Sequence, residues 1–361
     1  MLYSLLTSLV DTFTFLNVFK YITFRIGLSV VTSLTIIFLI GTPLIKYFEK
    51  KQITGPIRQD GPIDHIIKKS GTPTMGGLMI LIGIIVSTIL WADLKNIYIW
   101  IVLFVCTGLG LLGFLDDYLK IKFKNSSGVN AKLKFFGQFI ISLISILLLV
   151  YFTDHETISN LYFPFFKNLV LNMGLFFIPF GIFVIIGSSN AVNLTDGLDG
   201  LATVPVMLVA LSFSLICYLV GNTIFANYLQ IQYIPNVGEL SIFCGSIVGS
   251  CLGFLWYNAP PAKIFMGDTG SLSLGGSIAA VAIIVKHEIV LAIIGGLFVL
   301  ETVSVIIQVI SFKLTGKRVF MMAPIHHHFE KKGWAESTVV IRFWIIAIIL
   351  ALVGLATLKL R

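Results

Sequence analysis

The chain has 361 residues, of which 57% are hydrophobic and 12% charged, and its mean hydropathy is +0.97. Soluble domains carry about 25% charged residues, so this composition excludes a soluble globular protein and predicts an integral membrane protein. The 25 Lys and Arg outnumber the 17 Asp and Glu, which gives a net charge of +8. We expect these bases to face anionic membrane lipids and an anionic substrate, with no nucleic-acid partner.

The segment 1–21 precedes the first long apolar run. It lacks the basic start and small-residue cleavage site of a signal peptide, so we expect an interfacial helix lying on the membrane. The four cysteines all fall inside later apolar runs, and we expect no disulfide.

Ten apolar runs follow, each near the length of about 20 residues that lets a helix cross the bilayer. Their approximate bounds are 22–45, 74–93, 97–115, 135–153, 171–189, 199–220, 239–257, 269–285, 288–311 and 338–358. They show no period-two alternation, which favours helices over a β-barrel. The predicted fold is therefore an all-α integral membrane protein of about ten transmembrane helices, with 22–361 as one polytopic domain.

The bases are concentrated in alternate loops. Most lie in 46–69, 120–134 and 313–332. By the positive-inside rule these loops are cytoplasmic and both termini face outward. The same parity places five polar stretches on the cytoplasmic side: DGPIDHIIKKSGTPTMGG (60–77), GFLDDYLKIKFK (113–124), SSNAVNLTDGLDGLA (188–202), NAPPAKIFMGDTGSL (258–272) and MAPIHHHFEKKG (322–333).

Two adjacent carboxylates, Asp116 and Asp117, end the third apolar run. Neighbours on a helix differ by about 100°, so we expect different partners: one carboxylate faces a cation or phosphate while the other braces a lysine. A surface ion pair with Lys120 is the alternative. Asp268 lies at the start of a later span, where we expect it to bind a metal; the alternative role of capping the helix would not exclude metal binding. Mg²⁺ is commonly held by one or two carboxylates together with water and substrate phosphates.

In NAVNLTDGLDG, oxygen-bearing side chains recur every three residues at Asn190, Asn193, Asp196 and Asp199. This spacing predicts a stack along one side of a helix, with Gly197 leaving the backbone open to a ligand.

The consecutive His326, His327 and His328 cannot all reach one tetrahedral ion. We expect one or two of them to contact a phosphate or carboxylate, with a solvated loop as the alternative. Carboxylates, lysines and histidines on one face of a helical bundle indicate phosphoryl transfer, which depends on charge neutralisation and positioning.

The motifs GTPTMGG, GFLDDYLK, NAVNLTDGLDGLA, FMGDTGSL and MAPIHHHFE, in this order, resemble the phospho-N-acetylmuramoyl-pentapeptide transferase family of the polyprenyl-phosphate hexose-1-phosphate transferase superfamily. The resemblance covers the chain from about residue 20. It implies transfer of phospho-MurNAc-pentapeptide from UDP-MurNAc-pentapeptide to undecaprenyl phosphate, which gives lipid I and UMP in peptidoglycan synthesis. It also implies Mg²⁺ dependence and a homodimer in the bacterial inner (cytoplasmic) membrane.

The resemblance also assigns residue roles. Asp116 matches the residue proposed to deprotonate the lipid phosphate, Asp117 braces the site, and Asp268 is the principal Mg²⁺ ligand with Asn193 as the second. Substrate-binding positions are Lys69 (with Lys68 as the alternative), Thr74, Asn190, Asp196, Gly197, Leu198, Asp199, Asn258 and Phe265, whose ring is offered to uracil. A basic strip of Lys120, Lys124 and Lys132 suits the phosphates, and His326, His327 and His328 form a motif of this branch.

Two other functions compete with this interpretation. A sister transferase that moves GlcNAc-1-phosphate onto the same lipid shares the aspartate motifs, but HHHFE and GTPTMGG argue against it. A secondary transporter predicts acids well inside the spans and internal repeats. Only Glu301 fits the transporter, because the other acids of the motifs lie at span ends.

Overall fold

A computed structural model describes residues 1–361 except 55–70, 124–127, 154–157, 167–168 and 360–361. The fold is almost entirely helical, as predicted. The helices are α1 (Leu2–Ser8), η1 (Thr14–Lys20), α2 (Ile22–Lys50), α4 (Gly77–Trp91), α5 (Ile97–Phe123), α6 (Ala131–Phe152), η2 (Gly174–Phe176), α8 (Phe177–Thr195), α9 (Thr203–Val220), α10 (Thr223–Leu229), η3 (Val237–Glu239), α11 (Leu240–Asn258), α12 (Gly267–Ile284), α13 (Glu288–Ile294), α14 (Gly296–Thr315), α15 (Ile325–Lys331), α16 (Glu336–Ala356) and η4 (Thr357–Lys359). Two short strands, β1 (Asn160–Tyr162) and β2 (Val170–Asn172), pair antiparallel with Asn160 opposite Asn172.

The predicted spans are confirmed with two differences. Within the described residues, nine helical segments are long and apolar enough to cross a membrane, and α4, with 15 residues, is a shorter apolar helix at the second predicted span. The ninth span was expected to be continuous over 288–311, but the chain breaks at Gly295 into α13 and α14. The adjacent Gly295 and Gly296 explain the break, because glycine is a poor helix former and Gly pairs are common kink sites.

Helix α12 forms the centre of the bundle. Its residues from Thr269 to Ile284 are all buried, and it packs against α5 on one side and α8 on the other. Small residues permit this approach. A Cβ on Gly113 of α5 would lie 2.2 Å from the carbonyl oxygen of Asp268, and one on Gly275 would lie 2.4 Å from that of Ser188. The glycine at 113 therefore lets the end of α5 reach the start of α12.

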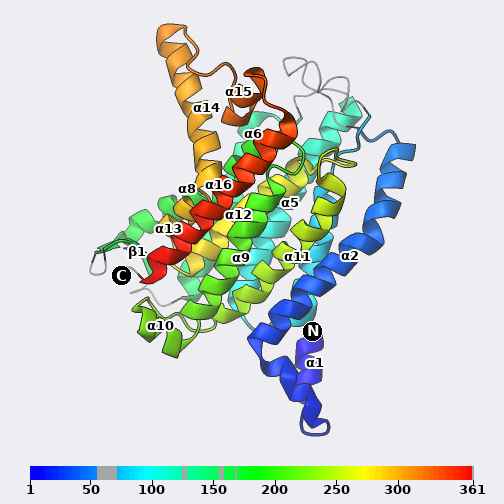
Figure 1. The fold of residues 1–361 in the computed structure, drawn as a ribbon. Helices are drawn as coiled ribbons and strands as arrows, with labels where there is room; N and C mark the ends of the chain where they lie inside the picture. Colours follow the sequence, from blue (N-terminus) through cyan, green and yellow to red (C-terminus); the bar gives the residue numbers. More distant parts are fainter. Residues whose placement is uncertain (55–70, 124–127, 154–157, 167–168, 360–361) are drawn as a thin grey trace.

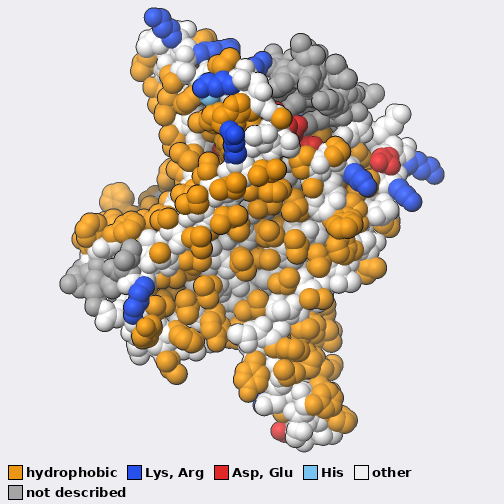
Figure 2. All heavy atoms as spheres, in the orientation of Figure 1, with side chains coloured by type: hydrophobic (Ala, Val, Ile, Leu, Met, Phe, Trp, Pro, Cys, Tyr) orange, Lys and Arg blue, Asp and Glu red, His pale blue; other side chains and the backbone are white. Residues whose placement is uncertain are grey.

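The two chain termini lie at the same end of the bundle, and α15 lies at the other end (Figure 1). If the shorter α4 is counted with the nine longer segments of the described residues, the number of crossings is even, which agrees with this arrangement of the termini. Apolar side chains cover the middle of the face seen in Figure 2, and most of the visible Lys and Arg lie near the end that carries α15. The four cysteines are buried and unpaired.

Candidate active site

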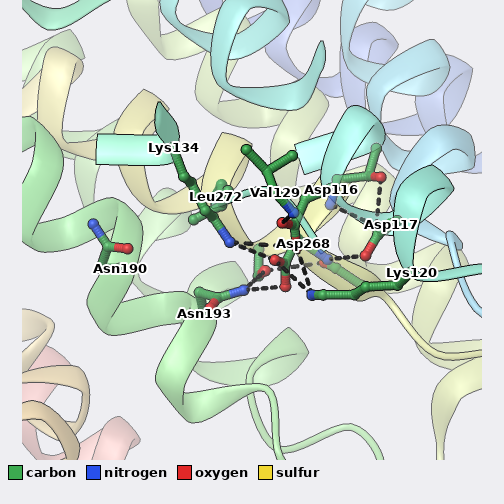
Figure 3. A network of polar contacts seen from close by, with 12 residues as sticks. Asp116, Asp117, Lys120, Val129, Lys134, Asn190, Asn193, Asp268 and Leu272 are labelled. Carbon is green, nitrogen blue, oxygen red and sulfur yellow. Dashed lines mark hydrogen bonds and ion pairs between the residues drawn. The ribbon is translucent and has the colours of Figure 1, made fainter. Parts of the chain in front are cut away.

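Asp268, the second residue of α12, is the centre of a polar cluster at the α15 end of the bundle (Figure 3). Its Oδ2 accepts from Lys120 Nζ at 3.0 Å and from Lys134 Nζ at 2.5 Å, and its Oδ1 accepts from Asn193 Nδ2 at 2.7 Å. These partners come from three different helices, α5, α6 and α8. Three of the predicted polar stretches therefore meet at one carboxylate.

Asp116 lies beside the same two lysines. Its Oδ2 is 2.5 Å from Lys120 Nζ and 3.6 Å from Lys134 Nζ, and its Oδ1 accepts from the Val129 backbone N–H at 2.7 Å. The predicted i,i+4 pair with Lys120 is present, but it is not a solvated surface pair, because Asp116 is 2% exposed. The lysine nitrogens instead link Asp116 to Asp268.

Asp117 forms no ion pair with a lysine of the described residues, contrary to the expectation that one of the two acids braces a lysine. Its Oδ1 accepts from the backbone N–H of Asp268 at 3.1 Å, and its Oδ2 accepts from the backbone N–H and hydroxyl of Thr269 at 3.0 and 2.7 Å. These amides belong to the first turn of α12, where N–H groups have no partner within the helix. The capping role considered for Asp268 is therefore wrong, because Asp117 fulfils it and thereby fixes the position of Asp268.

The predicted stack along NAVNLTDGLDG is wrong in its second half. Helix α8 ends at Thr195, so only Asn190 and Asn193 lie on it. Asp196 follows the helix in a turn, where burial raises the pKa of its carboxyl to about 7 and the nearby charges of Asp268 and Asp117 act in the same direction. Near neutral pH this carboxyl can therefore donate a hydrogen bond as well as accept one.

Asp199 and Asn258 hold the turn in place. Asp199 Oδ2 accepts from the Ala262 N–H at 2.9 Å. Asn258 is 2% exposed; its Oδ1 accepts from the Gly200 N–H at 3.0 Å and its Nδ2 donates to the Ile264 carbonyl at 3.0 Å. Leu198 packs in a small apolar core with residues of α16. These three side chains shape the turn, and their direct contact with a nucleotide stays a prediction.

The three histidines diverge, as expected from their spacing. His326 Nδ1 is 3.1 Å from Glu301 Oε1, and His327 Nδ1 is 2.7 Å from Glu330 Oε2. His328 Nδ1 accepts from the Met321 N–H at 3.1 Å. Two of the three thus contact carboxylates of the chain itself.

The other predicted site residues fall into three groups. Lys68, Lys69 and Lys124 lie outside the described residues. Thr74 and Phe265 lie next to the cluster: a Cβ on Gly267 would be 3.2 Å from Thr74 Oγ1, and Phe265 N–H donates to the Pro73 carbonyl at 2.9 Å. Asn190 is held away from the acids, because its Nδ2 donates to Gln138 Oε1 at 3.0 Å (Figure 3).

Lys134 is the residue that the sequence did not single out. It contacts both Asp116 and Asp268, whereas the predicted Lys132 is exposed. Residues two apart on a helix differ by about 200°, so only one of the two lysines can face the acids. The sequence supplied the pair, and the packing of α6 against α5 and α8 determines which one faces inward.

Replacing Lys134 by methionine is expected to lower the transferase kcat/KM by about 10- to 100-fold, because a charge-assisted contact to the buried Asp116 and the half-buried Asp268 is lost. The matched variant is Lys132→Met on the same helix, for which we expect a change of less than about twofold because side chains away from such contacts usually contribute little. Both are measured by UMP release. A larger loss of activity for Lys132→Met than for Lys134→Met would contradict the assignment of Lys134 and support the sequence-based prediction of Lys132.

The acids fit a divalent cation. Ligand atoms of Asp116, Asp117 and Asp268 all lie within 4.8 Å of one another. The oxygens of Asp117 are engaged by α12, so Asp116 and Asp268 are the better candidates. Both direct Oδ2 to the same two lysine nitrogens, which shows that the space between them favours positive charge. Asn193 now donates to Asp268 and could act as a ligand only through its amide oxygen.

The fold and the site define a membrane-embedded glycosyl transferase: the sequence model of Glycosyl transferase family 4 matches residues 99–286. Residues 69–81 match signature 1 of phospho-N-acetylmuramoyl-pentapeptide-transferase. Proteins of that name from Pelagibacter ubique (strain HTCC1062) and Maricaulis maris (strain MCS10) are 67% and 56% identical to the chain, each alignment covering 100% of both sequences. The chain therefore belongs to the phospho-N-acetylmuramoyl-pentapeptide-transferase family.

Proposed function

We propose that this chain transfers phospho-MurNAc-pentapeptide from UDP-MurNAc-pentapeptide to undecaprenyl phosphate, giving lipid I and UMP. The observation that carries the proposal is the meeting of Asp116, Lys120, Lys134, Asn193 and Asp268 at the ends of four helices, in a chain with full-length relatives of that name. The site lies where apolar spans end, so a lipid-borne phosphate and a soluble nucleotide can both reach it.

In the reaction, an oxygen of the lipid phosphate bonds to the sugar-bearing phosphorus, and the bond from that phosphorus to the bridging oxygen breaks to release UMP. Both reactants are anionic, so the chain must bring negative groups together. Lys120 and Lys134 can shift from the carboxylates to the phosphates and reduce that repulsion. Asp117 keeps the first turn of α12 fixed while they do so.

Two roles are open to Asp116: it accepts a proton from the lipid phosphate, or it orients the lysines and a metal. A phosphate monoester has a second pKa of about 6, so much of the lipid phosphate is already dianionic at neutral pH. In addition, Asp116 Oδ2 is engaged by Lys120 at 2.5 Å. We therefore propose that orientation is its main role.

Mg²⁺ is the proposed cofactor, held by Asp268 and Asp116 with the amide oxygen of Asn193 as a third ligand. When bound there it would neutralise charge on the diphosphate and the lipid phosphate. We also propose that the protein works as a homodimer in the bacterial inner membrane, with this site in the cytoplasm and both termini outside. The basic side chains near α15 support that orientation by the positive-inside rule.

The test is to incubate the purified full-length protein with UDP-MurNAc-pentapeptide, undecaprenyl phosphate and Mg²⁺ in detergent or lipid and to measure UMP. We expect UMP and a lipid-linked sugar in equal amounts, and loss of both when EDTA removes the metal. A parallel reaction with UDP-GlcNAc tests the sister activity. UMP release from UDP-GlcNAc but not from UDP-MurNAc-pentapeptide would favour the sister activity. UMP release that EDTA does not reduce would contradict the proposed need for Mg²⁺.

A further inference from the structure

Glu301 is a fully buried acid inside a membrane span. It lies on α14, which packs against α8, and its side chain is 0% exposed. An acid inside a span is costly unless it has a partner. Here the partner is His326 of α15, also 0% exposed, with Nδ1 at 3.1 Å from Glu301 Oε1. Helices α14 and α15 lie next to each other in Figure 1.

The opposite side of the His326 ring faces Gly197. A Cβ placed on Gly197 would lie 2.3 Å from His326 Nε2, so the imidazole occupies the space that a side chain at this position would need. Gly197 belongs to the turn after α8, next to Asp196. The ring is thus enclosed between a carboxylate on its Nδ1 side and the backbone of the turn on its Nε2 side.

Neither ring nitrogen of the buried His326 makes a hydrogen bond within the described part of the chain, but Nδ1 has the Glu301 carboxylate at ion-pair distance, whereas Nε2 has no such neighbour there. Buried polar atoms are hydrogen-bonded in the great majority of cases, so an unpartnered nitrogen aimed at a glycine indicates a place for a ligand atom. Because the Glu301 carboxylate lies on the Nδ1 side of the ring, Nε2 is the ring nitrogen left for that ligand.

We propose that Glu301 is a positioning residue: by holding the Nδ1 side of the His326 ring it presents Nε2 to a hydrogen-bonding group of the nucleotide substrate bound at the turn formed by residues 196–199. The inference rests on the proposed function and adds to it a residue that acts through His326 without touching substrate. It also gives the buried acid of α14 a role other than ion transport.

The test is a double-mutant cycle on the full-length protein, with the dissociation constant for UDP-MurNAc-pentapeptide measured by calorimetry in the presence of Mg²⁺. Glu301→Gln keeps the shape and an acceptor oxygen but removes the charge. His326→Asn keeps a donor near the Nδ1 position and removes Nε2. Ser304→Ala is the matched control, because the Ser304 hydroxyl is buried one turn further along α14 and donates to the Glu301 backbone carbonyl at 2.6 Å, not to its side chain.

We expect Glu301→Gln to weaken binding about tenfold, the size of one hydrogen bond to a charged group. In the His326→Asn background the same substitution should change binding by less than about twofold, and Ser304→Ala should bind normally. Equal weakening in both backgrounds would mean that Glu301 acts only through the fold, and no weakening in either would mean that it has no role; both results overturn the inference.

A second variant covers the case in which Glu301→Gln does not fold. Gly197→Ala displaces the His326 ring while leaving Glu301 intact, and we expect it to weaken binding by a similar factor. Normal binding by Gly197→Ala would also overturn the inference. Failure of the wild-type protein to bind the nucleotide sugar or to release UMP is a different result, because it contradicts the proposed function itself.

Discussion

Replacing Asp268 by asparagine is expected to reduce UMP release by about 100- to 1,000-fold, the range seen when one preorganised electrostatic group is removed from an active site. Among the described residues, Asp268 alone contacts Lys120, Lys134 and Asn193 together. An asparagine keeps the size of the side chain. It removes the charge that holds both ammonium groups, and it turns an NH₂ group towards donors.

The measurement is UMP release by purified protein at saturating substrates, together with the Mg²⁺ dependence of the remaining activity. The control is Asp93→Asn: Asp93 lies between α4 and α5 and caps the local turn by accepting from the Lys95 N–H at 3.0 Å. We expect its activity to stay within about twofold of wild type, as for most substitutions remote from such contacts. If Asp268→Asn keeps activity within tenfold of wild type, the Asp268 carboxylate is not essential for catalysis and the prediction is wrong.

The second large effect is expected at Asp116. Asp116→Asn should lose most of the turnover, about 100-fold or more for a lost charge contact in the site, with little change in the affinity for UDP-MurNAc-pentapeptide. The amide oxygen can still accept from the Val129 N–H, so the local backbone is kept. The charge opposite Lys120 and Lys134 is lost, which changes where those lysines rest when the lipid phosphate arrives.

Turnover and nucleotide affinity must be measured separately. Either proposed role of Asp116 predicts lower turnover with unchanged affinity, whereas a general role in substrate binding predicts lower affinity. A proton-accepting role also predicts that activity of the variant recovers as pH rises above the second pKa of the lipid phosphate, about 6 by analogy with other phosphate monoesters. An orienting role predicts no such recovery. Near-normal turnover at all pH values would contradict both roles.

The cluster of aspartates could be predicted because a carboxylate is costly inside the membrane. A carboxylate next to a span is retained only where a partner or solvent compensates its burial, so Asp116, Asp117 and Asp268 indicated from sequence alone the end of the bundle where polar side chains gather. The convergence of the five polar stretches followed from the alternation of the spans. The contacts of Asp268 with Lys120 and Asn193 confirm that convergence for three of the five stretches, 113–124, 188–202 and 258–272.

The identity of the partners could not be predicted in this way. Lys132 and Lys134 have the same residue type and differ only in which side of α6 they occupy. Asp196 and Asp199 were placed on a helix by their spacing, but α8 ends at Thr195 and the chain turns before them. Glu301 was the one acid that suited a transporter, and its contact with His326 places it instead beside the predicted substrate turn.

The sequence by itself therefore determined the class of protein, the approximate bounds of the spans and the end of the bundle that carries the chemistry, because hydropathy and charge act over whole segments. Only the tertiary structure decided that Lys134 faces the acids, that Asp117 caps α12, and that Glu301 meets His326. Each of these depends on how one helix is rotated against another; for α5 against α12, close packing at Gly113 fixes that rotation. A rotation of that kind leaves little trace in the composition or periodicity of either helix alone.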